Sequence, residues 1–249
     1  MPTAVPEGYP EAPSWLAEVP LAHRGLHDRE RPENSLPAFA AAAAAGYGVE
    51  LDVRLSADRV PMVCHDGDLE RLTGVAVRVG ELPATELARL RLLDTPSHVP
   101  TVAETLATLG DAPAMVELKQ PGLRAGELER RTAAVLAEHP GPWCVASFNP
   151  GSVRWFRDHQ PEAVRVLTAS PLDGSRLPAV VRRRLGALRD LPSVLPHAVS
   201  YDLAALPAPA PARWRRSGGV LVTWTAVGDA EVQRARTLAD NVIFEHASP

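Results

Sequence analysis

The chain has 249 residues, of which 45% are hydrophobic and 22% are charged, and its formal net charge is −4. This size and composition fit a globular protein with a substantial core, organised as one large α/β domain or two small ones. The acidic balance excludes a nucleic-acid binder whose affinity depends on neutralising phosphates, although a local cation can still hold a small anion. The two cysteines, Cys64 and Cys144, provide no disulfide framework and suit a reducing compartment.

The opening stretch, MPTAVPEGYPEAPSWLAEVP, does not have the pattern of a secretory signal. It lacks a basic start and a continuous apolar run, and no stretch of the chain approaches the roughly 20 apolar residues that a spanning helix needs. We therefore predict a cytoplasmic location and no transmembrane segment. Residues 1–18 are predicted to be a Pro-rich extension that packs loosely or frays, and residues 19–249 to form a single domain.

From residue 19 onward, β-branched runs alternate with helical patterns. The predicted strands are 19–25, 47–55, a short one at 60–65, 114–119, 143–148, 163–168, 198–203, 219–225 and 241–245. The predicted helices are 34–46 with Asn34 or Ser35 as its cap, 82–92 inside an irregular segment at 66–100, 101–110, 122–139, 151–159, 177–190 and 229–239. About eight strand–helix units in this length favour an α/β fold of the (β/α)8 TIM-barrel type, with a small insertion after the second strand.

Polar side chains gather where the predicted strands end. These groups are His23-Arg24, Glu50 with Asp52, His65-Asp66, Glu117 with Lys119, Ser147-Phe148-Asn149 and Thr223-Trp224-Thr225. The carboxyl ends of barrel strands form the face on which barrel enzymes build their active sites. A solvated strand face explains any one of these groups alone, but it does not explain their coincidence.

The types of these side chains indicate phosphate-ester hydrolysis. Three carboxylates in one small volume repel one another unless a cation joins them, and oxygen ligands suit Mg²⁺ or Ca²⁺ better than zinc. His23 and His65 are then available as acid and base, and Arg24 and Lys119 as cations for an anionic substrate. A divalent ion, two histidines and two cations together favour cleavage of a phosphodiester.

The stretch AHRGLHDRERPENSLPAFAAAAAAGYGVELDVRLSADRVPMVCHDGDLERLTG resembles the signature of the glycerophosphodiester phosphodiesterase family. The matching elements are H-R-G, P-E-N-[ST], E-x-D-V-x-[LM]-[ST]-x-D, H-D, L-x-R-x-[TS]-G and, later, V-E-L-K. The resemblance extends over residues 20–245 and is dense over 21–74. It implies a TIM barrel with one divalent cation, Mg²⁺ or Ca²⁺, that cleaves small glycerophosphodiesters to sn-glycerol 3-phosphate and an alcohol.

The resemblance also implies a role for each matching residue. The metal ligands would be Glu50, Asp52 and Glu117, and the catalytic acid and base would be His23 and His65. The substrate-binding residues would be Arg24, Lys119, Glu33 in an auxiliary role, Phe148 and Trp224. Asp66 either orients His65 or caps the following turn, and Cys64 is expected to be a small buried hydrophobic residue.

The last strand departs from the family pattern. Many relatives end in G-V-D-G-I-[IV]-T-D-x-P, whereas this chain ends in LADNVIFEHASP, which leaves the preference for the alcohol open. Two alternatives to the glycerophosphodiesterase activity remain: cleavage of lysophospholipids in the manner of a lysophospholipase D, and a catalytically inactive barrel that binds phosphodiesters.

Overall fold

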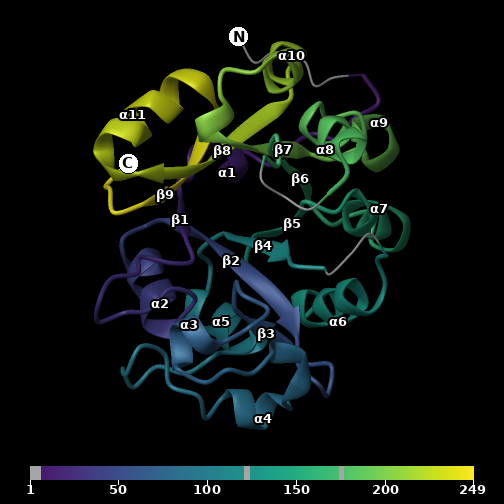
Figure 1. The fold of residues 1–249 in the computed structure, drawn as a ribbon. Coiled ribbons are helices and arrows are strands. Elements are labelled where there is room, and N and C mark those ends of the chain that lie inside the picture. The colour runs from purple at the N-terminus through teal and green to yellow at the C-terminus, as the bar shows by residue number, and fades with distance from the viewer. Residues whose placement is uncertain (1–6, 121–123, 174–176) are drawn as a thin grey trace. The chain divides into compact units, whose positions relative to one another are not determined.

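The computed structural model describes residues 7–120, 124–173 and 177–249 (Figure 1). The contacts divide it into two compact units, one of Leu21–Trp143 and one of residues 7–20 with Cys144–Pro249. The single domain at 19–249 and the extension at 1–18 stay predictions. Within that extension, residues 1–6 lie outside the described residues, and helix α1 (Trp15–Glu18) buries Leu16 completely.

The unit Leu21–Trp143 is built on three parallel strands. Strand β1 pairs with β2, and β2 pairs with β4, both in parallel, whereas the short strand β3 runs antiparallel to β2. The strands are β1 (Leu21–His23), β2 (Gly48–Leu55), β3 (Pro61–Val63) and β4 (Ala114–Leu118). The helices are α2 (Leu36–Ala44), α3 (Glu70–Thr73), the 3-10 turn η1 (Val79–Glu81), α4 (Ala84–Leu87), α5 (Val102–Leu109) and α6 (Glu127–Leu136).

Local sequence explains where the longer helices of this unit begin. Ser35 is the cap of α2, because its Oγ accepts a hydrogen bond from the backbone N–H of Ala38. Thr101 and Glu104 form a reciprocal capping box at the start of α5. Helices α2 and α5 lie side by side in Figure 1 and contact each other. Part of the predicted helix 122–139 lies outside the described residues, and α6 covers its middle.

The segment between β2 and β4 confirms the predicted insertion. It packs a small core of its own, formed by Met62, Cys64, Leu69, Leu72, Val79, Leu87, Leu92 and Val99. The predicted helix at 82–92 is wrong in length, because only one turn, α4, is helical. Beyond that turn, Arg91 and His98 form an isolated antiparallel bridge, and Leu93 and Asp94 have positive φ angles, so the chain reverses instead of continuing the helix.

The second unit carries five parallel strands in sequence order. They are β5 (Trp143–Ser147), β6 (Arg165–Ala169), β7 (Ala198–Asp202), β8 (Val220–Val227) and β9 (Asn241–Glu245), each paired with the next. The helical segments between them are α7 (Pro150–His159), α8 (Ala179–Gly186), α9 (Leu191–Val194), the 3-10 turn η2 (Leu203–Ala205), α10 (Pro209–Arg216) and α11 (Gly228–Leu238). Figure 1 shows α11 lying along β8 and β9.

Helix α10 is an element that the sequence pattern does not reveal. Its prolines suggest a connection, but Pro209 and Pro211 lie in the first helical turn, where backbone N–H groups have no partner within the helix. Trp214 anchors the helix, because its ring is buried and its Nε1 donates to the carbonyl of Val220 at 2.8 Å. No helix in the described ranges is long and apolar enough to cross a membrane.

Candidate active site

The register of three parallel strands brings four functional side chains together. The Cα of His23 lies opposite that of Glu50, and the Cα of Asp52 lies opposite that of Glu117. Glu50 and Asp52 are two residues apart on β2, so their side chains leave the same face of the strand. Both face inward, with only 2% and 1% of their surface exposed. The register thus brings together Glu50, Asp52, Glu117 and His23, which the sequence predicts to lie at the ends of neighbouring strands.

The turn after β1 requires a glycine. Arg24 and Gly25 both have positive φ angles, 57° and 84°, and a Cβ on Gly25 would lie 2.7 Å from the backbone of Ala38. Only glycine tolerates both this conformation and this close approach. The backbone N–H of Arg24 donates to the carbonyl of Glu50 at 2.8 Å, so the turn holds Arg24 against the carboxylates of β2.

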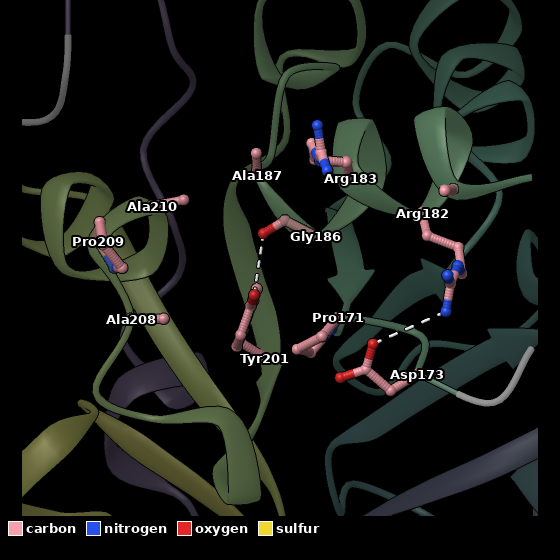
Figure 2. A pocket seen from close by; sticks show the side chains of 11 residues that line it. Pro171, Asp173, Arg182, Arg183, Gly186, Ala187, Tyr201, Ala208, Pro209 and Ala210 are labelled. Atoms are coloured by element: carbon pink, nitrogen blue, oxygen red, sulfur yellow. Dashed lines mark hydrogen bonds and ion pairs between the residues drawn. The ribbon is translucent and has the colours of Figure 1, made fainter.

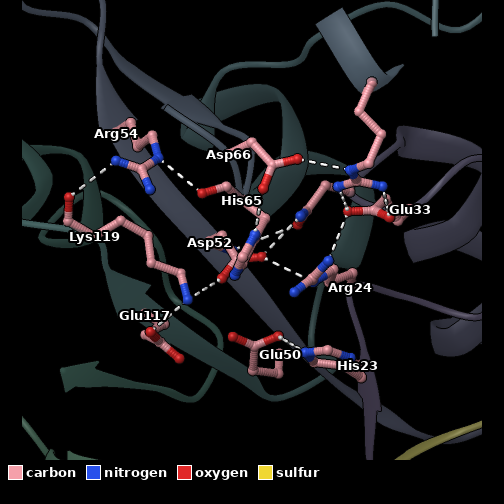
Figure 3. Close-up of polar contacts among 12 residues, drawn as sticks. His23, Arg24, Glu33, Glu50, Asp52, Arg54, His65, Asp66, Glu117 and Lys119 are labelled. Carbon is pink, nitrogen blue, oxygen red and sulfur yellow. Dashed lines mark hydrogen bonds and ion pairs between the residues drawn. The ribbon is translucent and has the colours of Figure 1, made fainter. Parts of the chain in front are cut away.

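Two cationic side chains, Lys119 and Arg24, form salt bridges with the carboxylate cluster (Figure 3). The Lys119 ammonium is 2.6 Å from Glu117 Oε1 and 2.9 Å from Asp52 Oδ1, and Arg24 Nε is 3.2 Å from Asp52 Oδ2. Burial by itself would raise the pKa of Asp52, but Lys119 and Arg24 outweigh it and hold that pKa below the usual range. Burial would lower the pKa of Lys119, but Glu117 and Asp52 attract the ammonium and raise it. Asp52 and Lys119 are therefore both charged.

Glu50 is the carboxyl group of the cluster that forms no salt bridge with Lys119 or Arg24 among the described residues. Its two oxygens are buried and accept no hydrogen bond from the residues that the structure describes, and Oε2 lies 3.7 Å from His23 Nε2. Burial, together with repulsion from Asp52 and Glu117, raises the pKa of Glu50 well above its usual value. A buried charge of this kind is unfavourable unless a positive group neutralises it.

The cluster fits a hard divalent cation. Glu50, Asp52 and Glu117 each offer a carboxylate oxygen, and these oxygens lie within 4.8 Å of one another. Mg²⁺ and Ca²⁺ take oxygen ligands of this kind, and the two orphaned oxygens of Glu50 favour a cation at this place. This group of residues can hold a metal ion, whereas the identity of that ion stays a prediction.

The two histidines flank the cluster within the same unit (Figure 3). His65 Nδ1 is 2.8 Å from Asp66 Oδ1, and Arg71 Nε is 2.7 Å from the other oxygen, Oδ2. Burial would raise the pKa of Asp66, but its bonds to His65 and Arg71 lower it, so the carboxylate is ionised and accepts the proton of Nδ1. Of the two roles left open for Asp66, the structure thus supports orientation of His65.

Glu33 holds arginines together at the edge of the cluster. Its carboxylate is 2.7 Å from Arg24 Nη1, and both Nη atoms of Arg71 lie at 2.8 Å. Burial would raise the pKa of Glu33, but Arg71 and Arg24 outweigh it and lower that pKa. The predicted contact of Glu33 with substrate stays a prediction, since its observed partners belong to the protein itself.

Three residues of the site had no predicted role in it. Asn34 is buried and donates from Nδ2 to Asp52 Oδ2 at 2.9 Å, Arg71 joins Glu33 to Asp66, and Arg54 donates to the backbone of His65. Asn34 belongs to the P-E-N element and Arg71 to the L-x-R element, so the family motifs could have indicated that both residues lie at the site. For Arg54 the only signal was its place two residues after Asp52 on the same strand face.

Phe148 and Trp224 belong to the second unit. There their rings pack edge to face, with centroids 5.4 Å apart. They line a cavity of about 600 Å³ at the ends of β5 to β8, together with Ser170, Pro171, Leu172, Asp173, Asp202, Ala204 and Ala205. The predicted contact of Phe148 and Trp224 with substrate stays a prediction.

Another cavity of the second unit, of about 460 Å³, lies between α8 and the start of α10 (Figure 2). Small residues such as Ala179, Ala187 and Pro209 line it, and the hydroxyl of Tyr201 donates to the carbonyl of Gly186 at 2.9 Å. Helix α8 buries none of its residues. In the other unit Cys64 is buried and its pKa rises to about 12, as expected for an unreactive thiol.

Comparison with known proteins identifies the family. Residues 23–246 match the model of the glycerophosphoryl diester phosphodiesterase family. Since this match covers nearly the whole chain, the chain belongs to that family. A solved phosphodiesterase from Oleispira antarctica, in complex with the product sn-glycerol-3-phosphate, is similar with a TM-score of 0.74 and 22% identity, over 95% of this chain and 93% of that chain. This likeness confirms the predicted fold, an eight-stranded parallel β-barrel with helices.

Curated relatives match part of the chain. It is 29% identical to glycerophosphodiester phosphodiesterase 1 of Homo sapiens over 163 residues, which are 61% of this chain and 49% of that protein. It is 31% identical to lysophospholipase D GDPD1 of Rattus norvegicus over 112 residues, which are 40% of this chain and 35% of that protein. The matches thus span half or less of the length of these relatives.

Proposed function

We propose that this protein hydrolyses glycerophosphodiesters to sn-glycerol 3-phosphate and an alcohol, with the help of a divalent cation. The observation that carries the proposal is the cluster of Glu50, Asp52 and Glu117, buried between two histidines in a chain of this family. A catalytically inactive binding barrel would need neither histidine. The Oleispira antarctica phosphodiesterase is in complex with sn-glycerol-3-phosphate as its product, and this supports the same direction of cleavage.

The surroundings of the two imidazoles suggest how they divide the proton transfers. His65 donates from Nδ1 to the ionised Asp66, so its Nε2 carries the lone pair. Burial lowers the pKa of His65, and the charges of Lys119 and Arg24 add to this against the opposing effect of Asp52. His65 is therefore neutral at pH 7, and we assign it as the general base. His23 then takes the role of the general acid.

The proposed reaction conserves protons and bonds. His65 accepts the proton of the attacking group as this group forms a bond to phosphorus. Attack by water gives sn-glycerol 3-phosphate directly, whereas attack by the neighbouring glycerol hydroxyl gives a cyclic phosphate that a water molecule then opens. The phosphorus–oxygen bond to the alcohol breaks, and His23 donates a proton to the departing oxygen. Arg24 and Lys119 hold the non-bridging oxygens. A divalent ion bound by Glu50, Asp52 and Glu117 supplies further positive charge at the phosphate.

A panel of glycerophosphodiesters with different alcohols tests the proposal. We expect release of sn-glycerol 3-phosphate that requires Mg²⁺ or Ca²⁺ and stops with EDTA. His65→Ala should lower kcat by about 10²–10⁴-fold with the fold intact, the usual weight of general acid–base catalysis. Turnover that is insensitive to both EDTA and His65→Ala would contradict the proposal, and binding without turnover in saturating metal would favour an inactive barrel.

Cleavage of lysophospholipids is the second candidate function. The likeness to lysophospholipase D GDPD1 of Rattus norvegicus favours it. Assays with glycerophosphocholine and lysophosphatidylcholine, run side by side, separate the two activities.

For the location we propose the cytoplasm, supported by two buried free cysteines, and cell fractionation tests this.

A further inference from the structure

A basic cavity of about 340 Å³ lies beside the active site, within the unit Leu21–Trp143. It forms where β2 ends, against the insertion and the beginning of α6. The lining residues used below are Arg54, Arg59, Gly67, Arg78, Lys119 and Glu127. Gly67 lies beside the guanidinium of Arg54, since a Cβ at this position would be in ordinary van der Waals contact with Nη1 at 3.6 Å.

The charges of the cavity are unbalanced in favour of an anion. No carboxylate forms a salt bridge with Arg54, Arg59 or Arg78 among the described residues. Among the described residues that line the cavity, the one carboxylate is Glu127, which is already held within α6 by two further arginines, Arg130 at 2.6 Å and Arg131 at 2.9 Å. Three arginines with no carboxylate partner in the described part of the chain therefore line one cavity.

Arg54, which lines this cavity, also contacts the backbone next to the active site (Figure 3). Its Nε donates to the carbonyl of His65 at 2.8 Å, and its Nη1 lies 3.5 Å from the carbonyl of Lys119. These carbonyl groups orient the guanidinium without cancelling its charge. Arg54 follows Asp52 by two residues on β2, which corresponds to about 6–7 Å along a strand. An anion in the cavity would thus lie next to the phosphodiester site and outside it.

We propose that this cavity is a second phosphate site, which takes a phosphate monoester group. The planar forks of several arginines match the paired oxygens of a phosphate, and this geometry favours phosphate over a neutral or cationic alcohol. This phosphate group has two possible sources. It belongs either to a substrate whose alcohol is phosphorylated, a reading that rests on the proposed function, or to free phosphate that acts as an effector. Both sources present the same chemistry to Arg59 and Arg78.

Calorimetric titration with inorganic phosphate tests the site without any turnover. The protein is kept in EDTA at low ionic strength, and Arg59→Gln/Arg78→Gln is compared with Arg89→Gln/Arg91→Gln. The control changes the net charge equally at two exposed arginines of the same insertion that do not line the cavity. We expect about tenfold or greater loss of phosphate affinity in the first variant only. Equal affinity in wild type and Arg59→Gln/Arg78→Gln, or an equal loss in the control, would overturn the proposal.

Kinetics then distinguish the two sources. The substrates are glycerophosphoglycerol and its analogue with a phosphate on the terminal hydroxyl. If the substrate supplies the group, Arg59→Gln/Arg78→Gln lowers kcat/KM for the phosphorylated analogue by about tenfold and leaves the other unchanged. If free phosphate supplies it, the variant instead loses the response of glycerophosphoglycerol turnover to added phosphate. Phosphate binding with no effect in either arm would indicate an adventitious ion only and overturn the proposal. A protein that binds phosphate at the cavity but cleaves no phosphodiester would contradict the proposed function alone.

Discussion

Replacing Glu50 with glutamine is the sharpest perturbation of the proposed metal site. Glutamine keeps the size of the side chain and removes one negative charge. In the cluster, Lys119 and Arg24 form salt bridges with the other two carboxylates. The buried oxygens of Glu50, in contrast, have no hydrogen-bond donor among the described residues. The raised pKa of Glu50, caused by burial and by its two acidic neighbours, means that this side chain resists ionisation without a metal. The metal-free protein should therefore tolerate Glu50→Gln.

The metal-bound protein should not tolerate this change. An ion present at a hundred times its Kd stabilises the folded state by about 2.7 kcal/mol, which corresponds to a rise in Tm of about 5–10 °C for a chain of this size. Two unit charges about 4 Å apart interact by about 4 kcal/mol near a protein surface. Losing the Glu50 charge should thus weaken binding by more than about 100-fold. At the same ion concentration the rise in Tm falls to about 1 °C.

Thermal unfolding with EDTA, Mg²⁺ or Ca²⁺ measures both effects without an activity assay. The control is Glu86→Gln, which removes an exposed carboxylate of α4 and should keep the full metal-dependent rise. A Glu50→Gln protein that keeps the wild-type rise in Tm would refute the assignment of Glu50 as a ligand. A Tm in EDTA far below that of wild type would refute the argument that this carboxyl group is uncharged in the metal-free protein.

Two further predictions concern Arg54 and His197. Arg54→Met keeps the aliphatic stem but removes the donors to the carbonyls of His65 and Lys119. We expect kcat to fall about tenfold, with KM for glycerophosphoglycerol nearly unchanged. A change in KM alone would contradict a positioning role for Arg54. Burial, and then the charge of Arg165, lowers the pKa of His197 to about 4. The unfolded chain therefore binds more protons between about pH 6.5 and 4, and acidification to pH 5 should destabilise the protein by about 1 kcal/mol after allowance for partial exposure. In urea titrations His197→Asn, which keeps an acceptor for the N–H of Arg165, should lose this contribution, and an unchanged pH dependence would disprove it.

Much of the fold could be predicted from the sequence, because strand–helix alternation is a local pattern. The eight parallel strands and the insertion after β2 follow from β-branched runs and their spacing. The errors occurred where local signals were ambiguous. The leucines at 82–92 suggested a longer helix than the single turn that this insertion accommodates, and the prolines of α10 concealed a helix whose stability depends on burying Trp214.

The sequence by itself determined which side chains are placed near one another along a strand or a turn. Period-two spacing set Glu50 and Asp52 on one face of β2. Only the tertiary structure decided the partners of these groups. Lys119 forms a salt bridge with Asp52, and Asp66 orients His65 through a hydrogen bond. Arg54 donates to the backbone of His65 and also lines a basic cavity. The physical reason is that long side chains reach across strands and loops, so their contacts depend on register and burial, which no local pattern of residues encodes.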